Sequence, residues 1–452
     1  MPKRILLVNP YVHDFSLYDF WIKPIALLYI SKYLKNYGFE IILLDLLDFK
    51  IKYKKDGTGK IYSEIIEKPK FFKNIPRNYR RYGMPIEIFK KKINEISKPD
   101  LILMTSFMTY WYPGVFETIK ILKEKFKDTK LFLGGVYVNL CYEHALLNSG
   151  ADFLIKFCEF EKIFEIVENI TSIKIERKKF EDIFLNDFPD YSLYKNLSSC
   201  AILTSIGCPF KCLYCASPIL YKKFIRRSPE KIFEEIKIYK NMGIKNVAFY
   251  DDALLFNYKE GFEEFLDRII KEKIDINFHT PNGIHAREID ENIALKLKKA
   301  NFKTIRIGFE SINDERLKNS FSFKSNKEIF LRAIKNLKRA GFEDIGAYVI
   351  IGLYDQSIEE IIDSYAFLYE NEIKIYPALF SPVPGTPYYH KWLERKNLKD
   401  PIFTNKSIYP DKPDEISFEK YERIKDFAKI LNRKIKEKIN VYKEAKEFLN
   451  LK

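Results

Sequence analysis

Three cysteines lie within eight residues, in the run GCPFKCLYC at positions 207–215. The spacing C-x3-C-x2-C allows Cys208, Cys212 and Cys215 to ligate three irons of a [4Fe-4S] cluster and leaves the fourth iron without a protein ligand. An open coordination position distinguishes a catalytic metal centre from a closed structural one. A structural zinc site would need a fourth ligand, and no Cys or His follows closely after Cys215. The spacing therefore favours an open iron–sulfur cluster over zinc or plain buried thiols.

The residues around this run predict a barrel. Six short apolar segments, each followed by a helical pattern, recur at intervals of about 30 to 45 residues, the period of a β/α unit. They are AILTSI (201–206), NVAFY (246–250), DINFH (275–279), TIRIGF (304–309), GAYVII (346–351) and IYPALF (375–380). Six such units predict a partial, TIM-like (β/α)6 barrel over residues 199–400, with its active site at the carboxyl ends of the strands.

Polar residues follow these predicted strands. The cysteine run follows the first strand, Asp251 and Asp252 follow the second, and Glu310 and Ser311 follow the fourth. Because the carboxyl ends of parallel strands meet at one end of a barrel, we expect thiols and carboxylates to gather at one mouth.

The cysteine run, with Tyr214 before its last cysteine, resembles the cluster-binding motif of the radical S-adenosylmethionine (SAM) superfamily. The resemblance extends from about residue 201 to 389, through IGFES (307–311), VIIGL (349–353) and SPVPGTPYY (381–389). In that family the open iron chelates SAM, and one electron from the cluster cleaves SAM to a 5′-deoxyadenosyl radical that abstracts a substrate hydrogen. The protein orients these groups and excludes water.

The resemblance also implies roles for the polar residues of the mouth. Tyr214 would contact the adenine of SAM, Asp251 and Asp252 would face its methionine end, and Glu310 and Ser311 would lie near its ribose. From the residues alone, the aspartate pair is explained about as well by capping of a turn into the next helix. A carboxylate at the end of a hydrophobic strand needs partners, which favours contact with SAM or substrate for Glu310.

A second α/β region precedes the barrel. Short apolar strands alternate with helical patterns and predict a doubly wound, Rossmann-like parallel sheet with helices on both faces. The predicted strands are 4–9, 40–45, 101–105, 130–133 and 153–155, and the helices include 24–37 and 115–126. We expect this domain at 1–170, a linker at 171–198, the barrel at 199–400 and a helical C-terminal region at 401–452.

The leading region is similar to the cobalamin (B12)-binding domain of B12-dependent radical SAM proteins, a group that includes anaerobic Mg-protoporphyrin ester cyclase-like proteins. The matching segments are NP (9–10), PIALLYI (24–30), TSF (105–107), GG (134–135) and GAD (150–152). The resemblance implies that Asn9, Thr105, Ser106, Gly134 and Gly135 contact cobalamin at the carboxyl edge of the sheet, where open α/β sheets bind ligands. A tight loop without a ligand is the alternative for the glycine pair.

Two departures bear on the cobalamin resemblance. The Asp-x-His-x-x-Gly motif that supplies a cobalt-ligating histidine is missing, so bound cobalamin would lack that ligand. FCEFE stands at 157–161, where the group often has Gly-Glu-Gly-Glu. A fold retained without cobalamin is therefore the alternative. No Gly-x-Gly-x-x-Gly motif or phosphate loop favours NAD or ATP.

Other residues that could do chemistry lack a compact pattern. Cys141, Cys158 and Cys200 are separated by 17 and 42 residues, so buried single thiols are a simpler interpretation than a second cluster. His279 ends the third barrel strand and either faces the barrel cavity or makes a structural hydrogen bond.

Length and composition fit a soluble enzyme of two or three domains. Of the 452 residues, 46% are hydrophobic, and no apolar run reaches the ~18 residues of a membrane span. We expect a cytoplasmic protein without a cleaved signal peptide. The net charge of +15 suggests an anionic partner, but residues 50–99 hold 15 Lys and Arg against 5 Asp and Glu. A solvated, Lys-rich surface is the simpler interpretation of that stretch, and nucleic acid is not the expected partner.

These features predict an oxygen-sensitive enzyme that uses SAM, a [4Fe-4S] cluster and cobalamin to methylate an unactivated carbon of a small-molecule substrate. An external one-electron donor of the flavodoxin or ferredoxin type is implied. The alternatives are a radical SAM cyclase, rearrangement enzyme or methylthiotransferase without cobalamin. An iron–sulfur electron carrier or sensor is a further alternative, but it leaves the open iron unexplained. The substrate cannot be read from the sequence, because barrel mouths accept many substrates.

Overall fold

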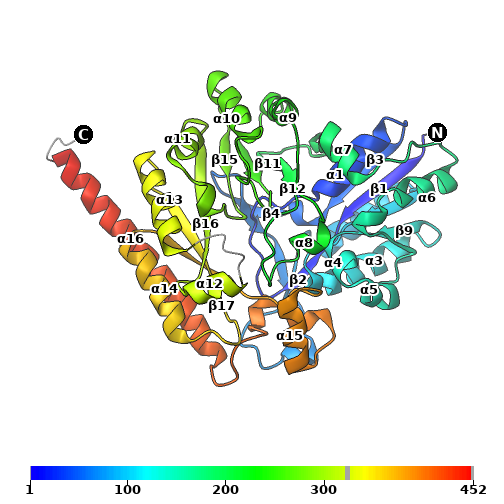
Figure 1. The fold of residues 1–452 in the computed structure, drawn as a ribbon. Helices are drawn as coiled ribbons and strands as arrows, with labels where there is room; N and C mark the ends of the chain where they lie inside the picture. Colours follow the sequence, from blue (N-terminus) through cyan, green and yellow to red (C-terminus); the bar gives the residue numbers. More distant parts are fainter. Residues whose placement is uncertain (1, 321–325, 449–452) are drawn as a thin grey trace.

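The computed structural model describes residues 2–320 and 326–448 and contains two parallel β-sheets side by side (Figure 1). The leading sheet has the strand order β10-β9-β8-β1-β3, and all its strand pairs are parallel. Its strands are β1 (Arg4–Asn9), β3 (Glu40–Asp45), β8 (Leu101–Met104), β9 (Lys130–Leu133) and β10 (Phe153–Leu154). The apolar pattern predicts each strand to within one residue.

Helices cover both faces of the leading sheet. Ile5 and Leu7 of β1 pack against one helical layer, whereas Leu6 and Val8 pack against the other, because successive strand residues point to opposite faces. The first layer consists of α1 (Ile25–Lys35), α6 (Lys162–Thr171) and α7 (Phe180–Asn186). The second consists of α2 (Ile86–Glu95), α3 (Tyr112–Lys125), α4 (Val136–Leu140) and α5 (Tyr142–Asn148). The sheet is therefore doubly wound, as predicted.

The second sheet has six parallel strands in the order β11-β14-β15-β16-β17-β18 and forms the partial barrel. They are β11 (Ser199–Ile202), β14 (Asn246–Phe249), β15 (Asn277–His279), β16 (Phe302–Glu310), β17 (Ile345–Ile351) and β18 (Lys374–Leu379). Ile305 and Ile307 of β16 face the surrounding helices, so the alternate residue Arg306 faces the barrel interior. The outer helices are α9 (Pro229–Asn241), α10 (Phe262–Lys271), α11 (Glu291–Lys299), α13 (Lys327–Arg339) and α14 (Ile358–Glu370).

The first predicted barrel strand, 201–206, is two strands in the structure. After β11 the chain leaves the barrel, and β12 (Ser205–Ile206) pairs antiparallel with β13 (Ile225–Arg226). The Asp251 carboxylate holds this turn, because it accepts hydrogen bonds from the backbone N–H groups of Thr204 (3.1 Å) and Ser205 (2.5 Å) and from both hydroxyls (2.6 Å each). Three short helices lie beyond the carboxyl ends of the barrel strands, namely α8 (Ser217–Leu220), α12 (Asp314–Ser320) and α15 (Pro387–Lys396).

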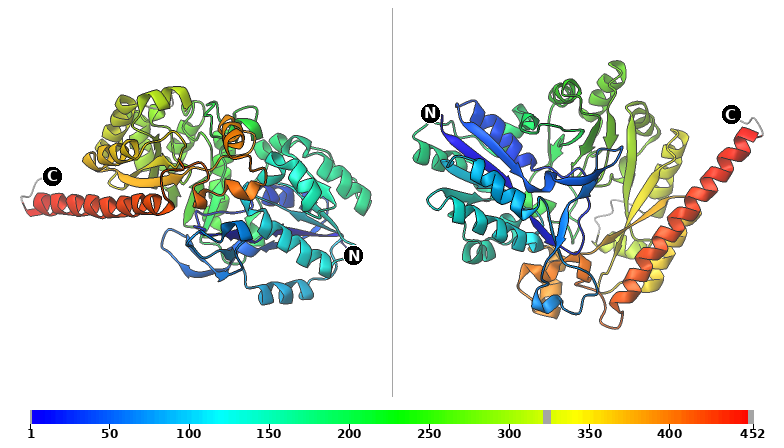
Figure 2. Two further views of the ribbon diagram at one scale, coloured as in Figure 1. Left: turned by 90° about the horizontal axis from the view of Figure 1, so that it is seen from below. Right: turned by 180° about the vertical axis from the view of Figure 1, so that it is seen from behind.

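Side chains cap both edges of the barrel sheet. At β11 the Tyr191 hydroxyl accepts a hydrogen bond from the Ala201 N–H (3.0 Å) and donates to the Ala201 carbonyl (2.7 Å). At β18 the Asn432 side-chain amide accepts a hydrogen bond from the Ile375 N–H (2.7 Å) and donates one to the Ile375 carbonyl (2.8 Å). Asn432 belongs to α16 (Phe418–Phe448), which lies along β18 and α14 (Figure 2). These contacts satisfy backbone groups that would otherwise offer an open edge to another chain.

The basic stretch 50–99 has a structural use that its composition does not reveal. β4 (Lys50–Tyr53) and β5 (Gly59–Ile61) form a hairpin whose tip packs against the first residue of β11. The Ser199 hydroxyl donates to the Gly57 carbonyl (2.9 Å), and a Cβ on Gly57 would lie 2.5 Å from the Ser199 Cβ. The hairpin therefore meets the amino end of the barrel, while Lys54 and Lys55 remain exposed beside its buried tip. β2 (Val12–Asp14), β6 (Ser63–Ile65) and β7 (Arg80–Tyr82) form a small antiparallel sheet nearby.

The C-terminal region contacts the leading region before its long helix begins. Asp14 is fully buried and accepts hydrogen bonds from the Trp111 indole N–H (2.7 Å) and from the Asn405 amide (3.0 Å). Asn405 lies between two 3-10 helices, Pro401–Thr404 and Lys406–Ile408. This buried network ties the C-terminal region to the small antiparallel sheet of the leading region.

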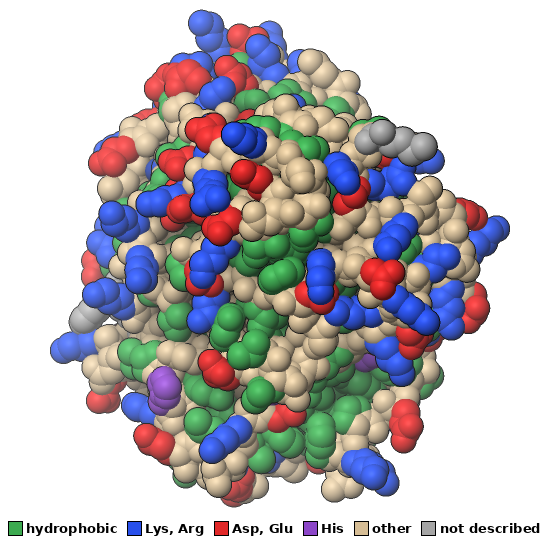
Figure 3. Space-filling view, turned by 90° about the vertical axis from the view of Figure 1, so that its right-hand side faces the viewer, with side chains coloured by type: hydrophobic (Ala, Val, Ile, Leu, Met, Phe, Trp, Pro, Cys, Tyr) green, Lys and Arg blue, Asp and Glu red, His purple; other side chains and the backbone are tan. Residues whose placement is uncertain are grey.

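The surface charge is mixed. On the face shown in Figure 3, Lys and Arg side chains lie interspersed with Asp and Glu side chains. Within residues 2–320 and 326–448, no helix is long and apolar enough to cross a membrane.

Candidate active site

The cysteine loop (residues 207–216) leaves the barrel between β12 and β13, and the pairing of these two strands holds its base. Gly207 has a φ of +79°, and a Cβ there would lie 2.3 Å from the Lys223 carbonyl oxygen. Only glycine permits this close approach of the outgoing and returning chain. Cys208 and Cys215 are half-buried, and Cys212 is buried.

The loop packs onto the carboxyl end of the barrel. Cys212 lies in an apolar cluster with Ile350 of β17. The Leu213 N–H donates to the Ser320 carbonyl of α12 (3.0 Å), and the Leu213 carbonyl accepts from the Tyr388 N–H of α15 (3.1 Å). The three cysteines therefore lie at the mouth of the barrel.

Three thiols on this loop fit a cluster better than a single metal ion. Among the described residues, no three His, Cys, Asp or Glu side chains are grouped so that they could hold a metal ion. A [4Fe-4S] cube distributes its ligands over different irons, so its cysteines need not converge on one point. We therefore propose that Cys208, Cys212 and Cys215 hold an iron–sulfur cluster.

The other three cysteines lie apart from the loop and from each other. Cys141 separates α4 from α5, Cys158 is exposed on the turn after β10, and Cys200 is buried in β11 among the outer helices. Burial raises the pKa of Cys141 to about 12. These three thiols thus lie on three different elements.

Glu310 ends β16 in a left-handed conformation. Its φ is +68°, which a residue other than glycine rarely adopts unless the surrounding structure imposes it. The register of β16 against β17 shifts between Gly308 and Glu310, and a Cβ on Gly308 would lie 2.8 Å from Glu310 Oε1. Glu310 Oε1 accepts a hydrogen bond from the Tyr214 hydroxyl (3.1 Å). Tyr214 of the cysteine loop and Glu310 of β16, both predicted to contact SAM, therefore lie next to each other.

The two aspartates after β14 have different surroundings. The Asp251 carboxylate is buried and holds Thr204 and Ser205, and burial raises its pKa. Asp252 is exposed and accepts a hydrogen bond from the Ser217 hydroxyl (2.6 Å). Neither caps the next helix, because α10 begins only at Phe262. We propose a structural role for Asp251 and a ligand contact for Asp252, which faces the cavity described next.

Ser311 and His279 are held by other side chains. The Ser311 hydroxyl donates to Glu360 of α14 (2.5 Å). The two ring nitrogens of His279 lie 2.9 Å from Thr304 Oγ1 and 3.1 Å from Asn246 Oδ1. Burial lowers the pKa of His279 to about 4, so this ring is neutral at pH 7. His279 therefore makes the structural hydrogen bonds that were one of its two predicted roles.

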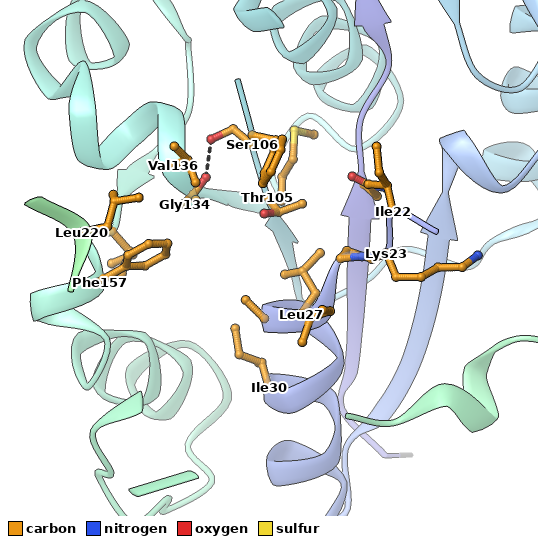
Figure 4. Close-up of a pocket in the computed structure, with 18 of the residues that line it drawn as sticks. Ile22, Lys23, Leu27, Ile30, Thr105, Ser106, Gly134, Val136, Phe157 and Leu220 are labelled. Atoms are coloured by element: carbon orange, nitrogen blue, oxygen red, sulfur yellow. Dashed lines mark hydrogen bonds between the residues drawn. The ribbon is translucent and has the colours of Figure 1, made fainter. Parts of the chain in front are cut away.

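A cavity of about 390 Å3 lies between the leading sheet and the barrel (Figure 4). Its walls are mainly apolar and come from the loops after β1, β8 and β9, from α1, and from the barrel. The barrel contributes Leu203, Ser205, Ile206, Leu220, Tyr221, Tyr250, Asp252 and Asn282. None of the described lining residues is a histidine.

The five residues predicted to contact a ligand at the sheet edge all line this cavity, namely Asn9, Thr105, Ser106, Gly134 and Gly135. The Ser106 hydroxyl donates to the Gly134 carbonyl (2.5 Å; Figure 4). Gly135 has a φ of +95°, and a Cβ there would lie 2.1 Å from the Ser106 carbonyl oxygen. The loop therefore requires glycine at 135 for its own geometry, whether or not a ligand binds.

Apart from Asp252, sequence reasoning missed the residues that the barrel supplies to the cavity. Tyr221 stacks on Phe157 of the leading region, with ring centroids 5.7 Å apart. The Tyr250 hydroxyl donates to the Phe20 carbonyl. Tyr250 and Asn282 lie at the ends of predicted strands, and this position could have identified them as candidate site residues. No sequence pattern identifies Tyr221, which follows the cysteine loop.

Comparison with protein families decides the identity of the barrel. Residues 202–368 match the Radical SAM superfamily. The matched part of the barrel is a radical SAM domain. The matched stretch runs from the end of β11 into α14 and contains the cysteine loop and Glu310. The match implies the [4Fe-4S] cluster and SAM that the sequence predicts.

Curated proteins that are similar to this chain include methyltransferases. The chain is 30% identical over 189 residues to an uncharacterized methyltransferase of Pyrococcus horikoshii. The aligned residues make up 41% of this chain and 40% of that protein. The chain is 26% identical over 288 residues to the bacteriochlorophyllide d C-12(1)-methyltransferase of Chlorobaculum tepidum. Here the aligned residues make up 59% of this chain and 60% of that protein. The chain thus spans about half the length of these relatives.

A solved structure shares the arrangement of both sheets. The radical SAM methyltransferase TsrM of Kitasatospora setae, with tryptophan and a SAM analogue bound, aligns with a TM-score of 0.64 at 16% identity, covering 87% of this chain and 76% of TsrM. Another structure of TsrM contains cobalamin and a [4Fe-4S] cluster. The likeness shows the fold, a leading α/β region followed by a radical SAM barrel.

Proposed function

We propose that this radical SAM protein is a cobalamin-dependent methyltransferase that methylates an unactivated carbon of a small molecule. The observation that carries the proposal is the position of the cavity. Its far wall is the carboxyl edge of the leading sheet, and its near wall includes Ile206 and Leu220, which flank the cysteine loop on either side. A ligand at the sheet edge would therefore face the group that the cysteines hold. The two methyltransferases among the relatives support this reaction class.

The cavity fits cobalamin in position and chemistry. Open α/β sheets bind ligands at their carboxyl edge, and apolar walls suit the face of a large macrocycle. Backbone groups of the two loops that contain Ser106 and Gly135 could bind the amide side chains of cobalamin. A lining without histidine fits the missing Asp-x-His-x-x-Gly motif, because cobalamin would then bind without that ligand.

Each group of residues has a defined part in this proposal. The cluster and SAM would supply a radical that abstracts a substrate hydrogen, and cobalamin would supply the methyl group. Cys208, Cys212 and Cys215 would hold the cluster, and Glu310 with Tyr214 would bind the nucleoside part of SAM. Asp252 would accept a hydrogen bond from a polar group in the cavity. The apolar walls would exclude water and keep the reacting groups close together.

Substitution of Glu310 tests the SAM site. We expect Glu310→Gln to weaken SAM binding by about 10- to 100-fold, because a hydrogen bond to a charged group contributes about 1.5 to 3 kcal/mol. Tyr214→Phe removes a neutral hydroxyl that orients the carboxylate, so its effect should be smaller, about fivefold. SAM affinity is measured by calorimetry on the anaerobically reconstituted protein, and the iron load should not change.

Ser311→Ala is the matched control, because its hydroxyl is bound to Glu360 and should leave SAM affinity within about twofold. Equal SAM affinity in Glu310→Gln and wild type would assign Glu310 a structural role. A larger loss of SAM affinity in Ser311→Ala than in Glu310→Gln would mean that Ser311 contacts SAM and that Glu310 is structural.

One experiment tests the proposed function as a whole. The chain is produced anaerobically with cobalamin supplied, and its visible spectrum is recorded before SAM and dithionite are added. We expect absorption from both the cluster and bound cobalamin, followed by formation of 5′-deoxyadenosine. Formation of 5′-deoxyadenosine without cobalamin uptake would favour a cyclase or rearrangement enzyme. Failure to form 5′-deoxyadenosine with a full cluster would contradict any radical SAM reaction.

A further inference from the structure

Two segments that meet beside the barrel carry a group of exposed apolar and basic side chains. They are residues 18–20 and the β4–β5 hairpin, residues 50–61. Asp19 joins the two segments, because its carboxylate pairs with the Lys50 ammonium (2.7 Å) and accepts a hydrogen bond from the Gly59 N–H (2.8 Å). The exposed residues of the two segments are Tyr18, Phe20, Ile51, Lys52, Tyr53, Lys54, Lys55 and Lys60. We call these residues the hairpin patch.

The apolar members of the hairpin patch are neighbours. The rings of Tyr18 and Phe20 have their centroids 5.9 Å apart. The Lys50 ammonium, which pairs with Asp19 between these two residues, lies 5.8 Å from the centre of the Tyr53 ring. The four apolar members, including Ile51, are 47% to 68% exposed. Single exposed apolar side chains are ordinary on protein surfaces, whereas a group of them indicates a surface that binds a partner.

The exposed charges of the hairpin patch are positive. All four of its charged members are lysines, whereas the acidic side chains of the two segments are engaged within the protein. The Asp19 side chain is only 3% exposed in its ion pair with Lys50. Asp56 is half-buried, and its carboxylate accepts hydrogen bonds from the Thr58 N–H (2.9 Å) and hydroxyl (2.7 Å). The surface therefore presents apolar side chains and positive charge together.

The hairpin is anchored on the barrel beneath the patch. The indole N–H of the buried Trp21 donates to the Asp56 carbonyl (2.7 Å), and its ring stacks on His279 with centroids 4.4 Å apart. Trp21 has a φ of +62°, which a bulky residue adopts only where the surrounding structure imposes it. The next residue, Ile22, lines the cavity. The chain from Tyr18 to Ile22 therefore leads from the hairpin patch to the cavity wall.

We propose that the hairpin patch is a docking surface for an anionic lipid membrane. Lysine ammonium groups are attracted to anionic headgroups, and aromatic and aliphatic side chains enter the zone between the headgroups and the acyl chains. A membrane fits the patch better than a nucleic acid does. The cations are all lysines, which are compact point charges, and Ile51 offers no aromatic face on which a base could stack. This inference goes beyond the proposed function and does not depend on it.

Binding to lipid vesicles tests the docking surface. The full chain, reconstituted anaerobically, is mixed with vesicles of phosphatidylcholine alone or with about one third phosphatidylglycerol, and the bound fraction is measured by sedimentation. We expect binding to the anionic vesicles to be at least about tenfold stronger than to the neutral ones. This binding should weaken as salt is added, because dissolved ions screen the attraction between the lysines and the headgroups.

Two double variants separate the charged from the apolar part of the surface. We expect K54E/K55E to weaken binding to the anionic vesicles at least about tenfold at low salt, since each reversal replaces attraction by repulsion. We expect I51S/Y53S to weaken it by about five- to tenfold, and this loss should persist at high salt because it removes apolar contact. Circular dichroism checks that each variant is folded, and if K54E/K55E does not fold, I51S/Y53S decides.

Each double variant has a matched control in the leading region. K90E/K91E reverses an exposed lysine pair on α2, and L146S/L147S alters an apolar pair on α5 that is 56% and 80% exposed. Both controls should bind the anionic vesicles within about twofold of wild type. Equal losses in variants and controls would overturn the proposal, as would unchanged binding in K54E/K55E and I51S/Y53S. Binding of a single-stranded oligonucleotide through Lys54 and Lys55, without vesicle binding, would also overturn it.

Discussion

Replacement of Cys208, Cys212 or Cys215 by alanine should abolish SAM cleavage and the load of about four irons per chain. Each thiolate is expected to hold a different iron, and the loop offers no substitute, because its other side chains are not metal ligands of iron–sulfur clusters. The measurements are iron and sulfide content after anaerobic reconstitution, and 5′-deoxyadenosine formation with dithionite.

The controls for this experiment are Cys141→Ala, Cys158→Ala and Cys200→Ala, which should keep a full cluster and SAM cleavage. These thiols lie outside the barrel mouth and apart from one another. Iron that persists in the triple variant of Cys208, Cys212 and Cys215 would show that the cluster is elsewhere. Loss of iron in Cys158→Ala would support a second cluster.

Thr105→Trp should block cobalamin uptake while the cluster and SAM cleavage remain. Thr105 lines the cavity on the loop after β8, where an indole would occupy the space over the sheet edge (Figure 4). We expect at least about a 100-fold loss of cobalamin affinity, or ~2.7 kcal/mol. The measurement is cobalamin absorbance that stays with the protein after gel filtration. Gly135→Trp is less suitable, because its Cβ alone would collide with the Ser106 backbone.

Ala26→Trp repeats the test from α1, which lines the cavity independently of the β8 loop. Leu147→Trp is the matched control in the leading region, because Leu147 is 80% exposed on α5 and should bind cobalamin as wild type does. Undiminished cobalamin binding in both Thr105→Trp and Ala26→Trp would place the ligand elsewhere. Loss in Leu147→Trp as well would point to a general effect on the domain.

The cysteine loop could be predicted from the sequence because its ligands are local. The three thiols need only a fixed spacing within eight residues, and that spacing is visible without a fold. The strands could be predicted for a similar reason, since buried parallel strands are continuous apolar runs. Glu310 was predicted as a site residue only from its position at the end of such a run.

The orientation of individual carboxylates could not be predicted in this way. Asp251 and Asp252 are neighbours in the sequence, yet one holds Thr204 and Ser205 and the other faces the cavity. The difference depends on where the chain turns after β11, 47 residues earlier. The contact between Tyr214 and Glu310 likewise joins residues 96 positions apart.

The sequence by itself predicted the cysteine motif, the polar residues at the ends of the barrel strands and the two α/β regions, because these depend on spacing and on local apolar periodicity. Only the tertiary structure decided that the basic hairpin meets the amino end of the barrel, that Glu310 is left-handed, and that Ile206 and Leu220, on either side of the cysteine loop, line the same cavity as the sheet edge. These features depend on packing between segments far apart in the chain, and such contacts leave no periodic pattern in the sequence.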